Sequence, residues 1–289
     1  MHQIAGFLSR WVLIPNENMT EAYDMRSVAP TVCSVLGIRS PRKAEREPLP
    51  EVVESLGPQR RLAVVVIDAF GSSTWDAAKT ETPTFNAIAN RHLLHLRSVM
   101  PTITPVNFAT MLTGASPDVH LIRAREEELT HETIFDVLRR EGRTSATAAR
   151  ALSSLGILIS PFADLPGIAE TNLDEDVCGL AVGAIEEGAN LVWVQLLDVD
   201  EVGHSHGPFS LESIAACHGA DTHLKYITRS AYQEGYGLIV LADHGQHTVV
   251  RENGSKVGTH GTLADEDVYV PFTWCNVSEL GGILGHAEQ

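Results

Sequence analysis

Three separate runs of apolar residues in this chain each end in aspartate, and this feature most constrains the fold. The runs cover residues 62–67, 191–197 and 237–242. Continuous apolar runs of this length are typical of strands buried on both faces, as in parallel sheets. Apolar residues at helical spacing occur at residues 130–142 and 173–188, after the first run, and at residues 210–235, after the second. Alternating strands and helices predict an α/β fold, a three-layer α/β/α sandwich with a mainly parallel central sheet.

The aspartates at the strand ends indicate a cation site. Asp68 follows the first run, Asp198 and Asp200 follow the second, and Asp243 follows the third. In open α/β sheets, ligands bind beyond the carboxyl ends of the strands. A single aspartate there is usually a turn or cap residue. Several carboxylates delivered to one edge repel each other unless a cation lies between them, so the group favours a metal site.

One histidine-bearing motif, LLDVDEVGHSHGP, follows the second run. His204 comes four residues after Asp200, so both side chains can face one ion. Asp198 is the rival ligand, because it lies two residues earlier. His206 is interpreted as structural or as a neighbour of the ligands.

Two further motifs, LADHGQH and GTHGT, supply the remaining candidates. Asp243 and His244 are adjacent at a strand end, and Gly245 permits the bend that would turn both toward a metal. His260 lies between glycines in a loop, which is weak evidence by itself. His247 has only proximity in its favour and is interpreted as structural.

The segment SVMPTITPVNFATMLTG predicts a helix that begins at Thr104. Threonine at the N-cap followed by Pro105 is a common helix start, and Gly114 ends the pattern. As an N-cap, Thr104 needs no further function. The same geometry would place its hydroxyl in the positive field of a helix N-terminus, which favours an alkoxide and a bound phosphate.

Length, hydrophobic content and net charge limit which kinds of protein this chain can be. The chain has 289 residues, 44% of them hydrophobic, which suits one large domain with a substantial core. A formal net charge of −16 argues against binding to nucleic acid or to an acidic membrane surface. A phosphate substrate stays compatible with this charge, because bound cations would offset some carboxylates.

The cysteines and the N-terminus bear on the compartment. Cys33, Cys178, Cys217 and Cys275 are far apart and form no C-x-x-C pair, so we expect buried free thiols and a reducing compartment. The apolar stretch near the N-terminus is short, is broken by Arg10 and precedes no cleavage pattern. We therefore expect neither signal peptide nor membrane span, and a cytoplasmic protein.

The domain expectation is one unit spanning residues 1–289. Residues 40–61 are charged and punctuated by prolines, which indicates a surface connection or linker. Residues 1–60 would thus form a helical segment and a connection packed on the core.

The order and spacing of these motifs resemble the alkaline phosphatase superfamily and, within it, the nucleotide pyrophosphatase/phosphodiesterase branch. The family pattern is a strand-end aspartate, then P-T-x-T-x-x-N, D-x-x-G-H, D-H-G and a late H-G. This chain has Asp68, PTITPVN, DEVGH, DHG and THG in that order, between about residues 62 and 274. Each motif alone is only modestly specific, but five motifs in the same order are strong evidence for the resemblance. The resemblance implies an alkaline phosphatase-like core without a large cap domain.

The resemblance also implies roles for these residues. It implies two divalent metal ions, for which zinc, manganese and iron all suit aspartate and histidine ligands, zinc being our first expectation. The implied ligands are Asp68, Thr104, Asp243 and His244 for one ion, and Asp200, His204 and His260 for the other. Thr104 would be the nucleophile and form a phospho-threonine that water hydrolyses. Asn107 would donate a hydrogen bond to a non-bridging phosphate oxygen.

The chain departs from the family pattern at three positions. Ile103 and Pro105 flank the threonine where the family often has lysine and an aromatic residue, and Leu121 stands where glycine is usual. These changes bear on substrate contacts. Residues 26–41 resemble a segment that relatives carry after the last metal histidine. This is either a permuted family helix, which would pack beside the strand near residues 270–274, or a chance match.

The implied substrate is a small phosphate ester, with nucleotides among the candidates. Phosphomonoesterases of the superfamily usually add an arginine clamp that we cannot identify here, so diester or pyrophosphate cleavage is favoured. No sulfatase motif occurs. A phosphonate hydrolase, a phosphomonoesterase or a phosphomutase remain alternatives. A metal-stabilised binding protein with a degenerate site is the non-enzymatic alternative, against which the complete ligand set and the intact threonine argue.

Overall fold

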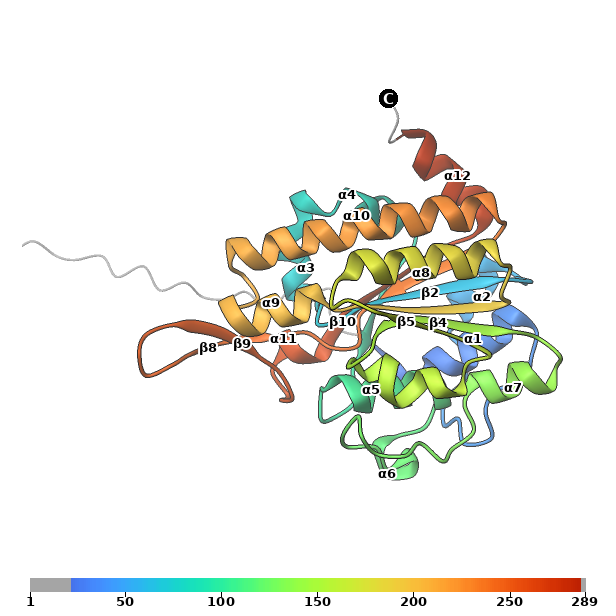
Figure 1. Cartoon of the computed structure of the whole chain (residues 1–289), viewed down its shortest axis with the longest axis horizontal. Coiled ribbons are helices and arrows are strands. Elements are labelled where there is room, and N and C mark those ends of the chain that lie inside the picture. Colours follow the sequence, from blue (N-terminus) through green and yellow to red (C-terminus); the bar gives the residue numbers. More distant parts are fainter. Residues whose placement is uncertain (1–21, 287–289) are drawn as a thin grey trace, which may run out of the picture.

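A computed structural model describes residues 22–286, in which helices cover both faces of one central eight-stranded sheet (Figure 1). In spatial order the strands are β1 (Tyr23–Asp24), β3 (Leu93–Arg97), β10 (Tyr269–Cys275), β7 (Gly237–Leu241), β2 (Leu62–Ile67), β6 (Leu191–Leu196), β4 (Ser145–Arg150) and β5 (Leu165–Ala169). The predicted α/β architecture is confirmed. All three apolar runs form adjacent central strands.

The sheet is parallel apart from one strand. β2 pairs in parallel with β6 on one side and with β7 on the other, and β4 continues the parallel order beyond β6. β10 lies antiparallel between β3 and β7. The carboxyl ends of β2, β6 and β7 therefore meet at one edge, where the chain delivers the strand-end aspartates.

Helices form two layers around this sheet. On one face lie α3 (Ser72–Ala78), α4 (Pro83–Ala89), α8 (Asp174–Glu186), α10 (Leu211–Gln233) and α12 (Val277–His286). On the other lie α1 (Val28–Leu36), α5 (Thr104–Thr113), α6 (Pro117–His120) and α7 (Ile134–Arg140). The remaining longer elements are α2 (Pro50–Leu56), α9 (Asp198–His206), α11 (Asp265–Val268) and a hairpin of β8 (His247–Val250) and β9 (Lys256–Thr259). Short 3₁₀ or π turns are η1 (Met25–Ser27), η2 (Lys79–Glu81), η3 (Leu155–Ile159) and η4 (Ser160–Phe162).

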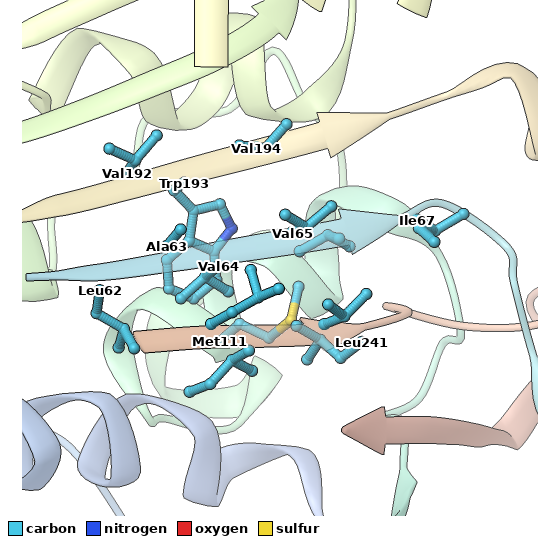
Figure 2. Close-up of a cluster of buried hydrophobic side chains, with 14 of the residues drawn as sticks. Leu62, Ala63, Val64, Val65, Ile67, Met111, Val192, Trp193, Val194 and Leu241 are labelled. Carbon is cyan, nitrogen blue, oxygen red and sulfur yellow. The ribbon is translucent and has the colours of Figure 1, made fainter. Parts of the chain in front are cut away.

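The core lies between the sheet and its helices. Val65 of β2, Trp193 of β6 and Leu241 of β7 are fully buried, and Met111 of α5 packs in the same cluster (Figure 2). Because both faces of the central strands are covered, their sequences show continuous apolar runs without alternation.

Several helix starts follow the expected chemistry. Thr133 caps α7 in a capping box with Asp136, and the Ser210 side chain accepts from the backbone of α10. The predicted start of α5 was wrong by one residue. Ile103 is the extended N-cap residue, so Thr104 is the first residue of the helix.

The prediction of a surface connection at residues 40–61 was wrong for its second half. There the chain forms α2, which buries Val52 and Leu56. Trp274 of β10 donates from Nε1 to Ser55 Oγ at 2.8 Å. Of the two N-terminal helices, α2 is therefore the one that lies beside β10. α1, at the position of the suspected family helix, is buried mainly against α2 and α5.

The expectation for the N-terminal apolar stretch around Arg10 lies outside the described residues. Between residues 22 and 286, none of the helices combines the length and the apolar character that crossing a membrane requires.

Candidate metal centre and active site

Asp68, Asp243 and His244 converge where the neighbouring strands β2 and β7 end. All three side chains are fully buried. The backbone N–H of Ala69 donates to Asp243 Oδ1 at 3.2 Å. His244 Nε2 lies 3.6 Å from Asp68 Oδ1 and 3.3 Å from Asp243 Oδ2. These atoms surround a space suited to one ion, and we call this group the first cluster.

Thr104 faces the first cluster from the start of α5. Its half-buried side chain places Oγ1 3.1 Å from His244 Nε2 and 3.5 Å from Asp68 Oδ1. As the first residue of the helix, it lies among backbone N–H groups that have no partner within the helix. A negative charge on this oxygen, or on a phosphate bound to it, is favoured there.

Asp200, His204 and His260 form a second cluster. Asp200 and His204 lie one turn apart on α9, and His260 lies in the loop after β9. Asp200 Oδ1 is 3.3 Å from His204 Nε2 and 3.6 Å from His260 Nε2, and the two Nε2 atoms are 3.1 Å apart. The His260 ring stacks on His244 with 4.0 Å between ring centroids, so the two clusters are neighbours.

Each histidine of the two clusters places Nδ1 against a backbone carbonyl oxygen. The pairs are His204 with Gly258 at 3.0 Å, His244 with Gly245 at 3.1 Å, and His260 with Thr102 at 2.9 Å. Because a carbonyl only accepts hydrogen bonds, Nδ1 must carry the proton. A neutral ring then turns a bare Nε2 into the cluster, as metal-bound histidines do. In the absence of an ion, His204 Nε2 lies beside Asp200 and can carry a second proton, which an ion would displace.

The electrostatics of the first cluster favour a cation. Burial, with Asp243 and Asp200 nearby, raises the pKa of Asp68 well above its usual range. Burial raises the pKa of Asp243 to about 7, and its Oδ2 is buried without a hydrogen-bond donor. Burial lowers the pKa of His244 to about 3, which keeps the ring neutral. Buried carboxylates without cationic partners are costly, and a divalent ion would remove that cost.

The second cluster also fits a divalent ion. Burial opposes ionisation of Asp200, but the hydrogen bond and charge of His204, with the other histidines, lower its pKa overall. The same hydrogen bond raises the pKa of His204, whereas burial lowers that of His260. One carboxylate and two imidazoles are a donor set that zinc commonly takes.

Two buried glutamines orient the cluster carboxylates. Gln195 Nε2 donates to Asp68 Oδ2 at 2.6 Å, which leaves Oδ1 toward Thr104 and His244. Gln246 Nε2 donates to Asp200 Oδ1 at 2.6 Å. The sequence reasoning missed both. A lone glutamine inside the apolar run LVWVQLL was the available signal for Gln195.

Close packing explains the glycines of two motifs. A Cβ on Gly203 would lie 2.1 Å from Gln246 Oε1, and a Cβ on Gly245 would lie 2.0 Å from the carbonyl oxygen of Glu266. The predicted reason for Gly245, freedom to bend, was wrong, because it does not adopt a positive φ. What these positions require is the absence of a side chain.

Asn107, to which the resemblance assigns a phosphate-donor role, is hydrogen-bonded to the loop before Thr104. Its fully buried amide accepts from the backbone N–H of Val99 at 2.9 Å, and donates to the carbonyls of Val99 and Ile103 at 3.3 Å each. Both amide groups are thus used within the loop that leads to Thr104. Asn107 positions this loop.

The other candidate residues lie apart from the two clusters. Asp198, the proposed rival ligand, lies on α9 and bonds to Arg150. His247 Nδ1 pairs with Asp267 Oδ1 at 2.8 Å, in keeping with its structural interpretation, and His206 is exposed.

Comparisons with known proteins agree with this arrangement. The family model for type I phosphodiesterase / nucleotide pyrophosphatase matches residues 62–126 and 129–286. Among curated proteins, the 2,3-bisphosphoglycerate-independent phosphoglycerate mutase of Campylobacter jejuni subsp. doylei is 31% identical over 111 residues, which are 38% of this chain and 22% of the mutase.

Two solved structures share the fold. An inactive threonine-to-alanine variant of murine ectonucleotide pyrophosphatase / phosphodiesterase 5, in complex with AMP, has a TM-score of 0.57 at 20% identity, over 67% of this chain and 59% of that one. Phosphonoacetate hydrolase from Sinorhizobium meliloti 1021, with phosphonoformate, has a TM-score of 0.55 at 19% identity, over 68% and 59% of the two chains.

The chain spans about a fifth of the mutase and 59% of each of these two structures. The family match, in contrast, covers most of the chain and includes every residue of both clusters. The chain therefore belongs to the type I phosphodiesterase / nucleotide pyrophosphatase family of the alkaline phosphatase superfamily.

Proposed function

We propose that this protein hydrolyses phosphodiester or pyrophosphate bonds with two divalent ions, through Thr104 as nucleophile. The observation that carries the proposal is the position of Thr104 Oγ1, which faces Asp68 and His244 at the start of a helix. The inactivity of the murine relative's threonine-to-alanine variant supports a nucleophilic threonine in this family.

Asp68, Asp243 and His244, with Thr104, would hold one ion, and the second cluster would hold the other. We propose zinc, with manganese or iron as alternatives, because all three accept carboxylate and imidazole ligands. When bound, the ions would lower the pKa of a coordinated hydroxyl and neutralise charge on phosphate oxygens.

The chain's own residues then have separate roles in the reaction. Gln195 and Gln246 hold the carboxylates of Asp68 and Asp200 in place. Thr104 Oγ1 loses its proton to solvent and forms the new bond to phosphorus, and the bond to the leaving-group oxygen breaks, with its electron pair going to that oxygen, which takes up a proton. Water hydrolyses the phospho-threonine and restores the hydroxyl. Asn107 keeps the loop before Thr104 in the orientation that this attack requires.

The family match favours a diester or pyrophosphate over a monoester, and the sequence offers no motif for the arginine clamp of a monoesterase. A dianionic monoester phosphate is usually met by a guanidinium clamp. A monoanionic diester needs less positive charge, and nucleotides carry such linkages.

The test compares substrates and Thr104 variants in metal-loaded protein. We expect a chromogenic phosphodiester to be cleaved faster than a monoester or phosphonoacetate, and chelation to abolish turnover. Thr104→Ala should lower kcat by at least about 10³-fold while the fold persists, and Thr104→Ser should retain appreciable activity. Near-normal turnover by Thr104→Ala would instead mean that water attacks phosphorus directly.

A further inference from the structure

Arg150 is a buried cation that lies outside both clusters, at the end of β4. Its side chain is 1% exposed. Nε donates to Asp174 Oδ1 at 3.0 Å, Nη1 donates to Glu201 Oε2 at 2.9 Å, and Nη2 bonds both Asp174, at 2.6 Å, and Asp198. One guanidinium thus joins three carboxylates from two helices.

Asp174, the first residue of α8, connects this arginine to the backbone of α9. It is as buried as Arg150 and accepts from the backbone N–H groups of Leu197 and Asp198 at 2.9 Å each. The first N–H groups of a helix lack partners within it, and Leu197 provides no side-chain cap. Asp174 therefore caps α9 from outside, where a negative charge also suits the helix dipole.

The residues of α9 divide between two faces. Asp198 and Glu201 face Arg150, whereas Asp200 and His204 face His260. At about 100° per residue, the centres of these two faces differ by roughly 110° around the helix axis. Fixing the rotation of α9 on its first face therefore fixes the direction of the two candidate ligands on its second face.

We propose that Arg150 is a positioning residue, which sets α9 so that Asp200 and His204 meet His260 in a geometry that binds the second divalent ion. The inference rests on the proposed two-ion function. A buried ion pair that served stability alone would affect both clusters equally. A positioning residue acts on one of them, because the first cluster is carried by β2 and β7 and makes no bond to this network within the described residues.

The experiment is a calorimetric titration of metal-stripped full-length protein with Zn²⁺, without substrate. Wild type should show two binding events. Arg150→Met, which keeps most of the volume and removes the charge, should weaken one event by roughly 10- to 100-fold and should not weaken the other, because an uncompensated Asp174 charge near Asp68 would favour a cation there. Arg150→Lys should fall between the two. Arg139→Met is the matched control, because it removes an arginine that pairs with Asp164 at the surface, and it should match wild type.

A double variant identifies the cluster at which Arg150→Met weakens Zn²⁺ binding. His260→Ala should remove the second event, and adding Arg150→Met should then change nothing further. If Arg150→Met does not fold, Asp198→Asn and Glu201→Gln serve instead, because their side chains are 40% and 46% exposed, and together they should weaken the same event. If Arg150→Met weakens both binding events equally, or weakens neither, the inference about Arg150 is overturned and the proposed two-ion function still stands. A wild type that binds no metal would overturn the proposed function as well.

Discussion

At the scale of single residues, the site depends on which atom of each side chain is left free. Gln195 occupies one oxygen of Asp68, and three backbone carbonyls occupy Nδ1 of the histidines, so the remaining oxygen and nitrogen atoms point inward. Residue identities in five motifs predicted the members of both clusters. They could not predict which atoms face inward, because that depends on backbone groups distant in sequence.

For Asn107, too, residue identity did not predict which atoms are already used in hydrogen bonds. This residue gives the first test at the residue scale. Its amide makes three hydrogen bonds to the backbone before Thr104. Asn107→Ala should lower the free energy of unfolding by about 1–3 kcal/mol, because the backbone N–H and carbonyl of Val99 lose their partner, whereas the Ile103 carbonyl still accepts from the backbone N–H of residue 107. Chemical denaturation alongside kcat measures this. Unchanged stability with a large loss of kcat would support the direct role of Asn107 at the phosphate.

At the scale of elements, the predicted strands and helices were those with strong apolar patterns. α9 was not predicted, because DVDEVGHSH has no apolar stripe and buries only Val199 and Gly203. Its helix is stabilised by Arg150 and Asp174 and by packing against the β8–β9 hairpin, and none of these contacts is local in sequence. The short edge strand β5, LPGIA, likewise reads as a turn because it contains proline and glycine.

The contact between α9 and the loop after β7 gives the prediction for this scale. Gly203 lies where any side chain would collide with Gln246 Oε1, and Gln246 in turn holds Asp200. Gly203→Ala should displace Gln246 and weaken one Zn²⁺ binding event by about tenfold, with a lower Tm. Gly219→Ala on α10 is the control, because its added Cβ would meet open space. Equal metal affinities in the two variants would contradict this account.

At the scale of the whole molecule, the N-terminal region is tied to the body by charge as well as by α1 and α2. Glu132, just before α7, accepts from Arg39 Nη2 at 2.8 Å and from the backbone N–H of Arg42 at 2.7 Å, and it also pairs with Arg140. The Arg39 guanidinium, first among these partners, lowers the pKa of Glu132 to about 2. A single carboxylate thus joins two segments about ninety residues apart.

This carboxylate predicts an acid-dependent contribution to stability. A pKa depressed in the folded state contributes stability that is complete above the ordinary value of 4.5 and is lost as pH falls toward 2. Wild type should therefore be more stable than Glu132→Gln at pH 7, and the difference should shrink between about pH 4.5 and 2. Denaturation of both proteins across this range measures it. A difference that is constant with pH would show that Glu132 contributes through packing alone.

The place of β10 in the sheet has a consequence for synthesis on the ribosome. β3 and β7 flank β10, and both are made before residues 269–275 emerge, β3 much earlier in the chain and β7 shortly before it. Until then β3 and β7 each expose a strand edge of unpaired N–H and C=O groups, which are open to pairing with other chains. The loop bearing His260 also precedes β10, with only the short helix α11 between them. The nascent protein therefore closes its sheet only after the last candidate ligand has left the ribosome, and arrested chains ending before residue 269 should aggregate.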